Sequence, residues 1–278
     1  MGDEKVIPRL IATDLDGTLL DDAGKYDEQR FDQQLAALWE RQIRVVIATG
    51  DPLDYVQHLF APLKQRQRLT YIVEDGALIC TASGHVLQSS AIPVMLWQAA
   101  IQWIQRTPQL RNGFIIACGR RRAYTTLLAT TNRFQASQQF YPSLRTIKQF
   151  NQIKTPILKL DVTWTDSHTN VAGLVQHFND QFAGQLQATD AGMGGMNITL
   201  PQVNKATALQ SLGRRWQITP QQMAAFGNDG NDRTMLTFVG QDFAVANANP
   251  IVRRQVTWPL SRTNNQAAVL TQIATWLV

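Results

Sequence analysis

The sequence predicts an α/β protein, in which a parallel sheet with helices on both faces is interrupted by an inserted α/β domain. The prediction rests on pattern and on charge. Short apolar segments without helical periodicity alternate with helical patterns in the first and last thirds of the 278 residues. The middle third has another pattern and carries the positive excess, with 10 Lys/Arg and 4 Asp/Glu between positions 86 and 190.

The first third of the chain alternates between predicted strands and helices. RVVIA at 44–48 is typical of a buried strand, and the proline that follows at position 52 suits the first turn of a helix. The predicted elements are strands at 6–12, 44–48 and 71–73, helices at 28–42 and after Pro52, and a hairpin at 77–87 that turns at Ser83-Gly84.

The remaining two thirds divide near a glycine-rich stretch at 190–195, which is a predicted linker. The elements predicted before it are helices at 93–105 and 169–182 and strands at 114–118 and 158–164. Those predicted after it are helices at 205–212, 232–239 and 266–277 and strands at 223–226 and 242–245. We therefore expect a core domain made of residues 1–85 and 191–278 and an inserted domain of residues 86–190.

Composition favours a cytoplasmic protein without a membrane-spanning segment. At 44% hydrophobic residues the chain can bury a sizeable core, yet no apolar run reaches membrane-spanning length, and the start MGDEK does not resemble a signal peptide. Cys80 and Cys118 form no metal-like cluster, so we expect reduced thiols. Trp97, Trp103 and Trp164 are predicted to lie in the core of the inserted domain rather than to bind sugars.

Polar residues that can carry chemistry follow the predicted core strands. In an open parallel sheet, ligands bind at the carboxyl ends of the strands. We expect one crevice to gather these residues: Asp14 and Asp16 after the first strand, Thr49 and Gly50 after the second, Asn228, Asp229 and Asp232 after the strand at 223–226, and Lys205 at the start of a helix.

Clustered carboxylates point to a cation and a phosphate. Neighbouring carboxylates repel one another when ionised, and a hard divalent cation relieves that repulsion. Oxygen ligands with few nitrogens favour Mg²⁺, which in proteins commonly partners a phosphate. A carboxylate can then attack phosphorus to give an aspartyl-phosphate while its neighbour handles the proton. Alone, each element is as readily a turn, a cap or a solvated lysine; their order along the chain favours the functional interpretation.

The residues resemble a known family. DLDGTLL at 14–20, ATG at 48–50, Lys205 in VNKATAL and FGNDGND at 226–232 resemble the four motifs of the haloacid dehalogenase-like hydrolases. YIVEDGALI at 71–79 and VANAN at 245–249 resemble segments of the Cof-type branch, which carries a large α/β cap. The resemblance implies a Rossmann-like core with an inserted cap and Mg²⁺-dependent phosphoryl transfer.

The resemblance also implies roles for individual residues. Asp14 corresponds to the nucleophile and a metal ligand, and Asp16 to the general acid and base, with its main-chain carbonyl on the metal. Thr49 and the Gly50 amide would hold phosphate oxygens, and Lys205 would neutralise the nucleophile and the transferring group. The fourth motif would complete the metal site through members of the set Asn228, Asp229 and Asp232.

The sequence departs from the family pattern at two positions. Asn228 stands where the fourth motif usually has an aspartate, so the metal site loses a negative charge that Asp229 or Asp232 would have to restore. Asp51 stands where the branch often has an arginine, and a carboxylate cannot pair with an anionic substrate. Turnover is still expected, because the nucleophile and the acid/base are intact.

We therefore expect a Mg²⁺-dependent phosphatase of small phosphorylated metabolites, with sugar phosphates as the leading class. The alternatives are a sugar phosphomutase and a catalytically weakened regulatory protein that binds a phosphate ligand. Nucleic-acid binding through the basic insert is not expected, and no oligomeric state follows from the sequence. Arginines at 120–122 either contact a distal anionic group of the substrate or lie in a solvated loop.

Overall fold

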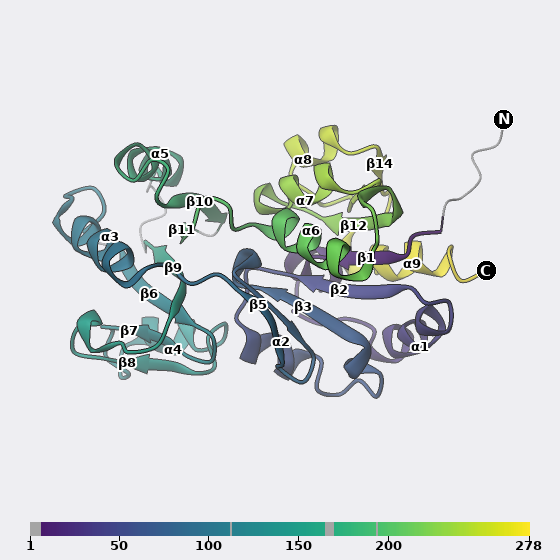
Figure 1. Ribbon diagram of the computed structural model, residues 1–278, viewed down its shortest axis with the longest axis horizontal. Coiled ribbons are helices and arrows are strands. Elements are labelled where there is room, and N and C mark those ends of the chain that lie inside the picture. Colours follow the sequence, from purple (N-terminus) through teal and green to yellow (C-terminus); the bar gives the residue numbers. More distant parts are fainter. Residues whose placement is uncertain (1–6, 112, 165–169, 193) are drawn as a thin grey trace. The chain divides into compact units, whose positions relative to one another are not determined.

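The computed structural model describes residues 7–111, 113–164, 170–192 and 194–278 (Figure 1). The described chain forms two compact units. The first unit comprises the described residues of Met1–Gly50 together with Leu59–Leu87 and Asn204–Val278, and the second comprises those of Asp51–His58 and Gln88–Val203. The predicted α/β class, a parallel-sheet core with an inserted α/β domain, is confirmed.

The first unit is built on an eight-stranded sheet in the order β14-β13-β12-β1-β2-β3-β4-β5. The strands are β1 Leu10–Thr13, β2 Arg44–Ala48, β3 Leu69–Val73, β4 Leu78–Thr81, β5 Val86–Ser89, β12 Met223–Gly227, β13 Gln241–Ala244 and β14 Trp258–Pro259. From β14 to β3 all neighbours are parallel, whereas β4 pairs antiparallel with β3. The parallel part therefore has a common carboxyl edge.

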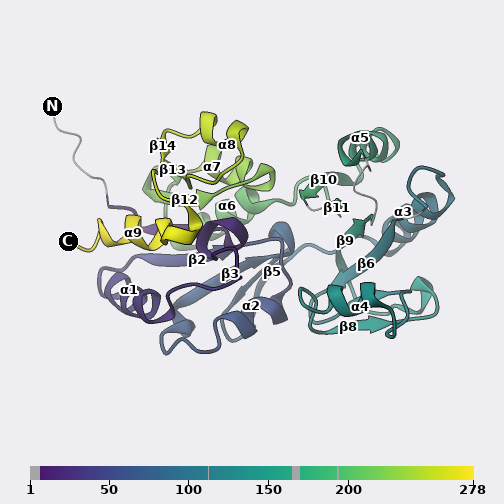
Figure 2. The same ribbon diagram turned by 180° about the vertical axis from the view of Figure 1, so that it is seen from behind.

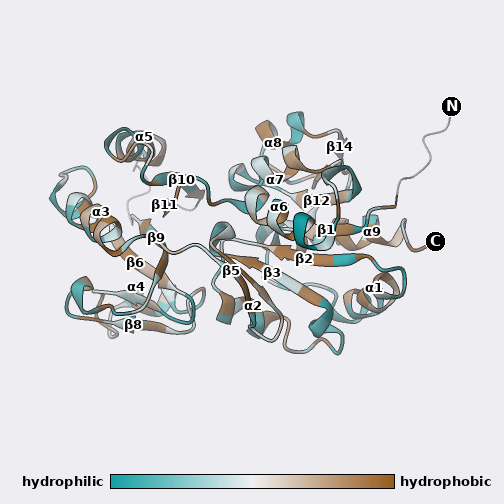
Figure 3. Cartoon of the chain, in the orientation of Figure 1, coloured by the Kyte–Doolittle hydropathy of each residue, from teal (hydrophilic) through white to brown (hydrophobic). Residues whose placement is uncertain are grey.

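Strand β1 lies inside this sheet, between β12 and β2. All of its residues are buried, as expected for a strand covered on both faces, and β2 is buried beyond Arg44. Figure 3 shows the hydrophobic colouring along β2. Burial on both faces explains why these strands are continuous apolar runs in the sequence.

Helices of the first unit pack in pairs. They are α1 Glu28–Glu40, α6 Lys205–Trp216, α7 Arg233–Phe238, α8 Pro250–Gln255 and α9 Ala268–Ala274, and α2 Leu53–Leu59 spans the limit between the units. Gln34 of α1 donates to the carbonyl oxygen of Leu270 in α9 at 2.7 Å, and α6 contacts α7. Figure 1 shows α6 in front of the sheet, and the reverse view in Figure 2 shows α9 in front, so the two pairs cover opposite faces.

The second unit contains a six-stranded sheet in the order β10-β11-β9-β6-β7-β8. Its strands are β6 Phe114–Gly119, β7 Ala123–Thr125, β8 Leu144–Thr146, β9 Ile157–Thr163, β10 Gln187–Gly192 and β11 Gly195–Thr199. Its helices are α3 Val94–Arg106, α4 Asn132–Ser137 and α5 Val171–Gln181. All strand pairs are antiparallel except β7 with β8.

The predicted tryptophans belong to the core of this second unit. Trp97 and Trp164 are buried in its main apolar cluster, and Trp103 packs against it with edge-on contacts to Phe178 and Phe182 at 5.7 Å. The prediction that these rings form core is thus confirmed. The arginines at 120–122 are exposed, and Arg120 donates to the Ser89 hydroxyl at 3.1 Å.

The linker predicted at 190–195 is wrong. The described residues of this stretch lie in and between β10 and β11, which pair antiparallel, and the first unit resumes only at Asn204. Main-chain hydrogen bonds hold this hairpin, and they do not depend on the type of side chain. A glycine-rich stretch can therefore form strands without the apolar pattern from which strands are predicted. The sequence also gave no signal for β7, β8, α4, α8 and β14, which are all short.

None of the helices in the described ranges combines the length and the apolar character that a bilayer crossing requires.

Candidate active site

Several of the predicted site residues follow the carboxyl ends of neighbouring parallel strands. Asp14 directly follows β1, and its N–H donates to the carbonyl oxygen of Phe226 in β12 at 3.0 Å. Thr49 directly follows β2, and its N–H donates to the carbonyl oxygen of Ile72 in β3 at 2.9 Å. The ladder thus continues one residue beyond the strands and fixes the main chain from which the site side chains extend.

Lys205 lies at the centre of the site between two carboxylates. Its Nζ is 2.7 Å from Asp14 Oδ1 and 2.7 Å from Asp232 Oδ1. The exposed fractions are 1% for Lys205, 6% for Asp14 and 0% for Asp232. Lys205 holds both carboxylates in place, because losing the lysine would leave their negative charges uncompensated and away from water.

The start of α6 explains why Lys205 is so well placed. Asn204 caps the helix: its side chain accepts from the Thr207 N–H at 2.9 Å, while the Thr207 hydroxyl accepts from the Asn204 N–H at 3.2 Å. This reciprocal cap fixes the first turn of the helix, where Lys205 is the first residue.

Asp232 organises the loop that follows β12. Its second oxygen, Oδ2, accepts from the N–H groups of Asn228 at 2.8 Å and Asp229 at 3.2 Å. A Cβ at Gly227 would lie 2.7 Å from the same oxygen, so glycine is required for this close approach. Both oxygens of Asp232 are therefore engaged with protein groups, one with Lys205 and one with the loop.

Asp14 and Asp232 share one lysine, so its single positive charge balances only one of their two negative charges. Burial, and then the charge of Asp232, raise the pKa of Asp14 from 3.8 to about 7 against the opposing effect of Lys205. Burial by itself would lower the pKa of Lys205, but the carboxylates of Asp14, Asp232 and Asp75 outweigh it and hold that pKa above its ordinary value. Lys205 therefore stays positively charged, whereas ionising Asp14 in the folded protein costs free energy.

The free-energy cost of ionising the buried Asp14 predicts that the stability of the folded protein depends on pH. Asp14 loses its proton near pH 3.8 when unfolded and near 7 when folded, so its favourable contribution is complete below pH 3.8 and is lost as the pH rises through 7. Asp14→Asn cannot ionise. With chelator present, we expect the variant to melt on the order of 5 °C higher than the wild type at pH 8, and by a smaller margin at pH 5, where less of the Asp14 contribution has been lost. Thermal unfolding at both pH values tests this; an equal difference at both would contradict it.

Asn228 is tied to the turn that carries Asp16. Its Oδ1 accepts from the Thr18 hydroxyl at 3.1 Å, and its amide nitrogen lies against Gly17 so closely that no Cβ fits there. Gly17 has a φ of +70°, and Asn247 donates to its carbonyl oxygen at 2.8 Å. The side chain of Asp16 is exposed on this turn, Leu15–Leu19. The first and fourth motifs are thereby joined directly.

Asp229 turns away from this cluster. It is exposed and caps the turn Gly230–Asp232, where its Oδ1 accepts from the Gly230 N–H at 2.7 Å. In the part of the chain that the structure describes, no group of three or more His, Cys, Asp and Glu side chains is arranged as a metal centre. A metal here would need amide or main-chain oxygens besides a carboxylate.

The donor set nevertheless fits magnesium. Asp14 and Asp232 share a single lysine, so the ionised cluster carries a net negative charge, and the charge of Asp232 adds to burial in raising the pKa of Asp14. The available donors are oxygens, namely the Asp14 carboxylate and the Asn228 amide, which suits a hard divalent cation.

A match to a family model decides the family. The model for haloacid dehalogenase-like hydrolases covers residues 11–273 of this chain. The chain is a haloacid dehalogenase-like hydrolase. The expectation of an enzyme of this family, drawn from the four motifs, is confirmed.

Individual members of the family match this hydrolase over most of its length. The 5-amino-6-(5-phospho-D-ribitylamino)uracil phosphatase YbjI of Escherichia coli is 24% identical and aligns over 94% of this chain and 93% of its own. An HMP-PP phosphatase of Enterobacter sp. is 26% identical, over 87% and 85% respectively. Among solved structures, SMU.1108c of Streptococcus mutans superimposes with a TM-score of 0.90 at 28% identity and covers 97% of this chain and 99% of that one.

Residue-by-residue reasoning about this hydrolase missed Asp75. It lies at the end of β3, in the turn Glu74–Gly76, and its N–H donates to the carbonyl oxygen of Thr49 at 3.1 Å. The signal was present: the acidic pair Glu74-Asp75 ends an apolar strand directly before a glycine, as Asp14 ends β1. In the sequence alone, the segment YIVEDGALI, which contains this acidic pair, supports only the family resemblance.

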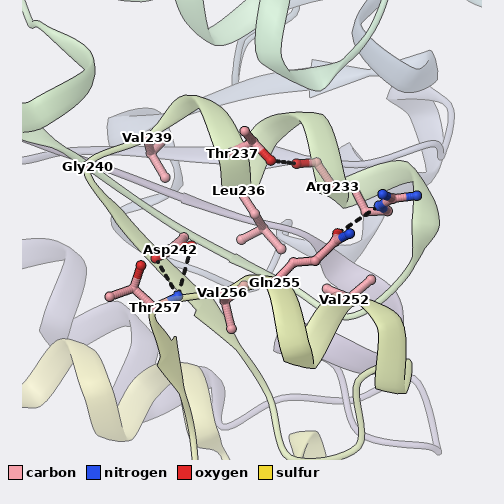
Figure 4. Close-up of a pocket in the computed structure, with 10 residues that line it drawn as sticks. All are labelled: Arg233, Leu236, Thr237, Val239, Gly240, Asp242, Val252, Gln255, Val256 and Thr257. Atoms are coloured by element: carbon pink, nitrogen blue, oxygen red, sulfur yellow. Dashed lines mark hydrogen bonds between the residues drawn. The ribbon is translucent and has the colours of Figure 1, made fainter.

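A cavity elsewhere in the first unit is not this site. It lies between α7, β13 and α8, has a volume of ≈ 230 Å³, and contains none of the predicted site residues (Figure 4). Its polar groups bond to one another: Arg233 Nε donates to Gln255 at 2.9 Å, and both Asp242 oxygens accept from the Thr257 N–H at 3.1 Å. The cavity therefore contributes no side chain to the chemistry at Asp14.

Proposed function

We propose that this hydrolase is a phosphatase that acts on small phosphorylated metabolites, with sugar phosphates as the leading class. The observation that carries the proposal is the buried lysine that bridges Asp14 and Asp232 at the carboxyl edge of the sheet. The lysine orients a carboxylate that directly follows the central strand, and it supplies a permanent positive charge where a phosphate would bind. Nucleophilic displacement at phosphorus requires both features.

In this mechanism Asp14 attacks the phosphorus of the substrate. A bond forms between a carboxylate oxygen and phosphorus, the bond to the ester oxygen breaks, and Asp16 donates its proton to the departing alkoxide. The product is an alcohol and an aspartyl-phosphate at position 14. Asp16, now ionised, accepts a proton from water, which attacks the aspartyl-phosphate and releases inorganic phosphate. The exposure of Asp16 suits a residue that exchanges protons with water and leaving groups.

The transferring phosphoryl group is held by Thr49, Gly50 and Lys205. The Thr49 hydroxyl and the Gly50 amide donate to its oxygens, while Lys205 compensates the charge that accumulates as Asp14 approaches. Because Lys205 is already bound to Asp14, no reorganisation is needed to align it. This arrangement lowers the barrier by positioning and by electrostatics.

Magnesium would be held by the Asp14 carboxylate, the Asp16 main-chain carbonyl and the Asn228 amide oxygen. Asp229 and Asp232, the other predicted ligands, are not proposed as direct ligands. Asp229 caps a turn, and both oxygens of Asp232 are engaged, one with Lys205 and one with main-chain N–H groups. Bound there, Mg²⁺ would supply the charge that keeps Asp14 ionised and neutralises phosphate oxygens. Asn228 in place of an aspartate leaves this ligand set with one negative charge fewer.

The relatives and the charge pattern support the substrate class. The curated relatives named above are phosphatases, and the name of YbjI specifies a substrate with a 5-phospho-D-ribityl group. The second unit contains most of the basic insert, and its arginines at 120–122 are exposed. A basic surface raises the local concentration of anionic metabolites. These observations favour phosphorylated metabolites without specifying one.

Phosphate release tests the proposal. We expect inorganic phosphate to form from members of a panel of sugar phosphates, nucleotides and an aryl phosphate with Mg²⁺, and to fall to background with chelator. In parallel, Mg²⁺ should raise the melting temperature of the wild type and leave Asp14→Asn unchanged. An isomeric sugar phosphate without free phosphate would instead identify a mutase, and metal binding without any turnover would identify a regulatory protein.

A further inference from the structure

A strained turn contacts three parts of the candidate site. In the turn Glu74–Gly76 all residues have positive φ, +51° at Glu74, +56° at Asp75 and +104° at Gly76. This left-handed region is unfavourable for residues with side chains, and it persists where the surrounding structure enforces it, often at functional sites. Asp75 is buried within this turn, with an exposed fraction of 8%.

The turn fixes the main chain at the phosphate-binding position. The Asp75 N–H donates to the carbonyl oxygen of Thr49 at 3.1 Å. The Asp75 carboxylate lies flat against Gly50, since a Cβ at position 50 would be 3.1 Å from its Oδ1 and 3.3 Å from its Oδ2. The Gly50 main chain is thus held on one side by Asp75.

The same turn touches the neighbours of Asp232 and Lys205. Asp75 Oδ1 accepts from the side chain of Asn231, the residue before Asp232, at 3.3 Å. Gly76 packs against the main chain of Asn204, the residue before Lys205, so closely that no Cβ fits at position 76. One turn therefore contacts Gly50 and the residues next to both partners of the buried ion pair.

We propose that Asp75 is a positioning residue of this active site, whose carboxylate sets the Gly50 main chain and the Asn231–Asp232 segment relative to Asp14. The inference rests on the proposed phosphatase function. In-line attack needs the phosphorus aligned with the Asp14 oxygen only in the transition state, so a shift of Gly50 lowers kcat more than it weakens substrate binding.

Two substitutions at this position separate its side chain from its backbone strain. Asp75→Gly keeps the left-handed conformation and removes the carboxylate, whereas Asp75→Asn keeps the conformation and an oxygen that accepts from Asn231. Asp242→Ala is the control, since the Asp242 carboxylate likewise makes hydrogen bonds within the first unit, accepting from the Thr257 N–H, but lies outside the site.

We expect Asp75→Gly to lower kcat about 10- to 100-fold while KM rises less than about fivefold. Asp75→Asn should keep kcat within about threefold of the wild type, and Asp242→Ala should leave it unchanged. Unchanged kcat in Asp75→Gly overturns the proposal. Equal losses in Asp75→Gly and Asp75→Asn also overturn it, because then the charge and not the position matters.

Phosphate binding provides a readout that does not need turnover. Titration of inorganic phosphate in the presence of Mg²⁺, followed by ³¹P NMR, should show affinity about two- to fivefold weaker in Asp75→Gly than in Asp75→Asn. A wild type that binds phosphate but hydrolyses no ester overturns the phosphatase proposal alone, and the affinity series then decides the role of Asp75. A wild type that binds no phosphate overturns both.

Discussion

Asp14→Asn is expected to reduce phosphate release by at least about 10⁴-fold, because the amide cannot form the aspartyl-phosphate and hydrolysis must proceed by direct attack of water on the ester. The substitution is nearly isosteric, and the amide oxygen can still accept from Lys205. The loss should therefore appear in kcat with a folded protein. Steady-state release from the best substrate of the panel, at saturating Mg²⁺, measures it.

Asp16→Asn is the matched comparison for this loss. It retains the nucleophile but lacks the acid that protonates the leaving alcohol, so a substrate with a good leaving group, an aryl phosphate, should still phosphorylate Asp14. Mass spectrometry of the Asp14 peptide should then show an added phosphoryl group in Asp16→Asn and none in Asp14→Asn. Wild-type rates in Asp14→Asn would exclude the mechanism.

Lys205→Met is expected to destabilise the protein by about 3 to 5 kcal/mol and to abolish turnover, because it leaves Asp14 and Asp232 buried without a counter-charge. For a chain of this size that corresponds to a melting temperature lower by about 10 °C. Methionine preserves most of the side-chain volume, so the effect reports charge rather than a cavity. Thermal and urea unfolding with chelator present measure the loss.

The double variant Asp14→Asn/Lys205→Met isolates the electrostatic part of this effect. Removing one carboxylate should recover part of the stability. The recovery should be larger at pH 8 than at pH 5, because burial raises the pKa of Asp14, Lys205 opposes that rise, and the cost of burying this acid without Lys205 grows with pH. Losses that simply add in the double variant would show that Asp14 and Lys205 do not interact energetically.

The order of polar residues along the chain was sufficient to predict the position of the candidate site. The residue order after each apolar strand predicted that Asp14, Thr49, Asn228 and Lys205 meet at one edge, because parallel strands end on the same side of a sheet. The alternation of short apolar runs with helical patterns, and the different pattern and charge of the middle third, likewise predicted the fold class. These features are local, so they can be read from short stretches of residues.

The individual contacts within the candidate site are visible only in the folded protein. Lys205 and Asp14 are 191 residues apart, and Asn231 and Asp75 are 156 apart. The commitment of Asp232 to Lys205, the raised pKa of Asp14 and the contacts of Asp75 depend on how these distant segments pack and exclude water. Residue spacing fixes side-chain direction along one element, whereas burial and hydrogen-bond geometry arise only when elements meet.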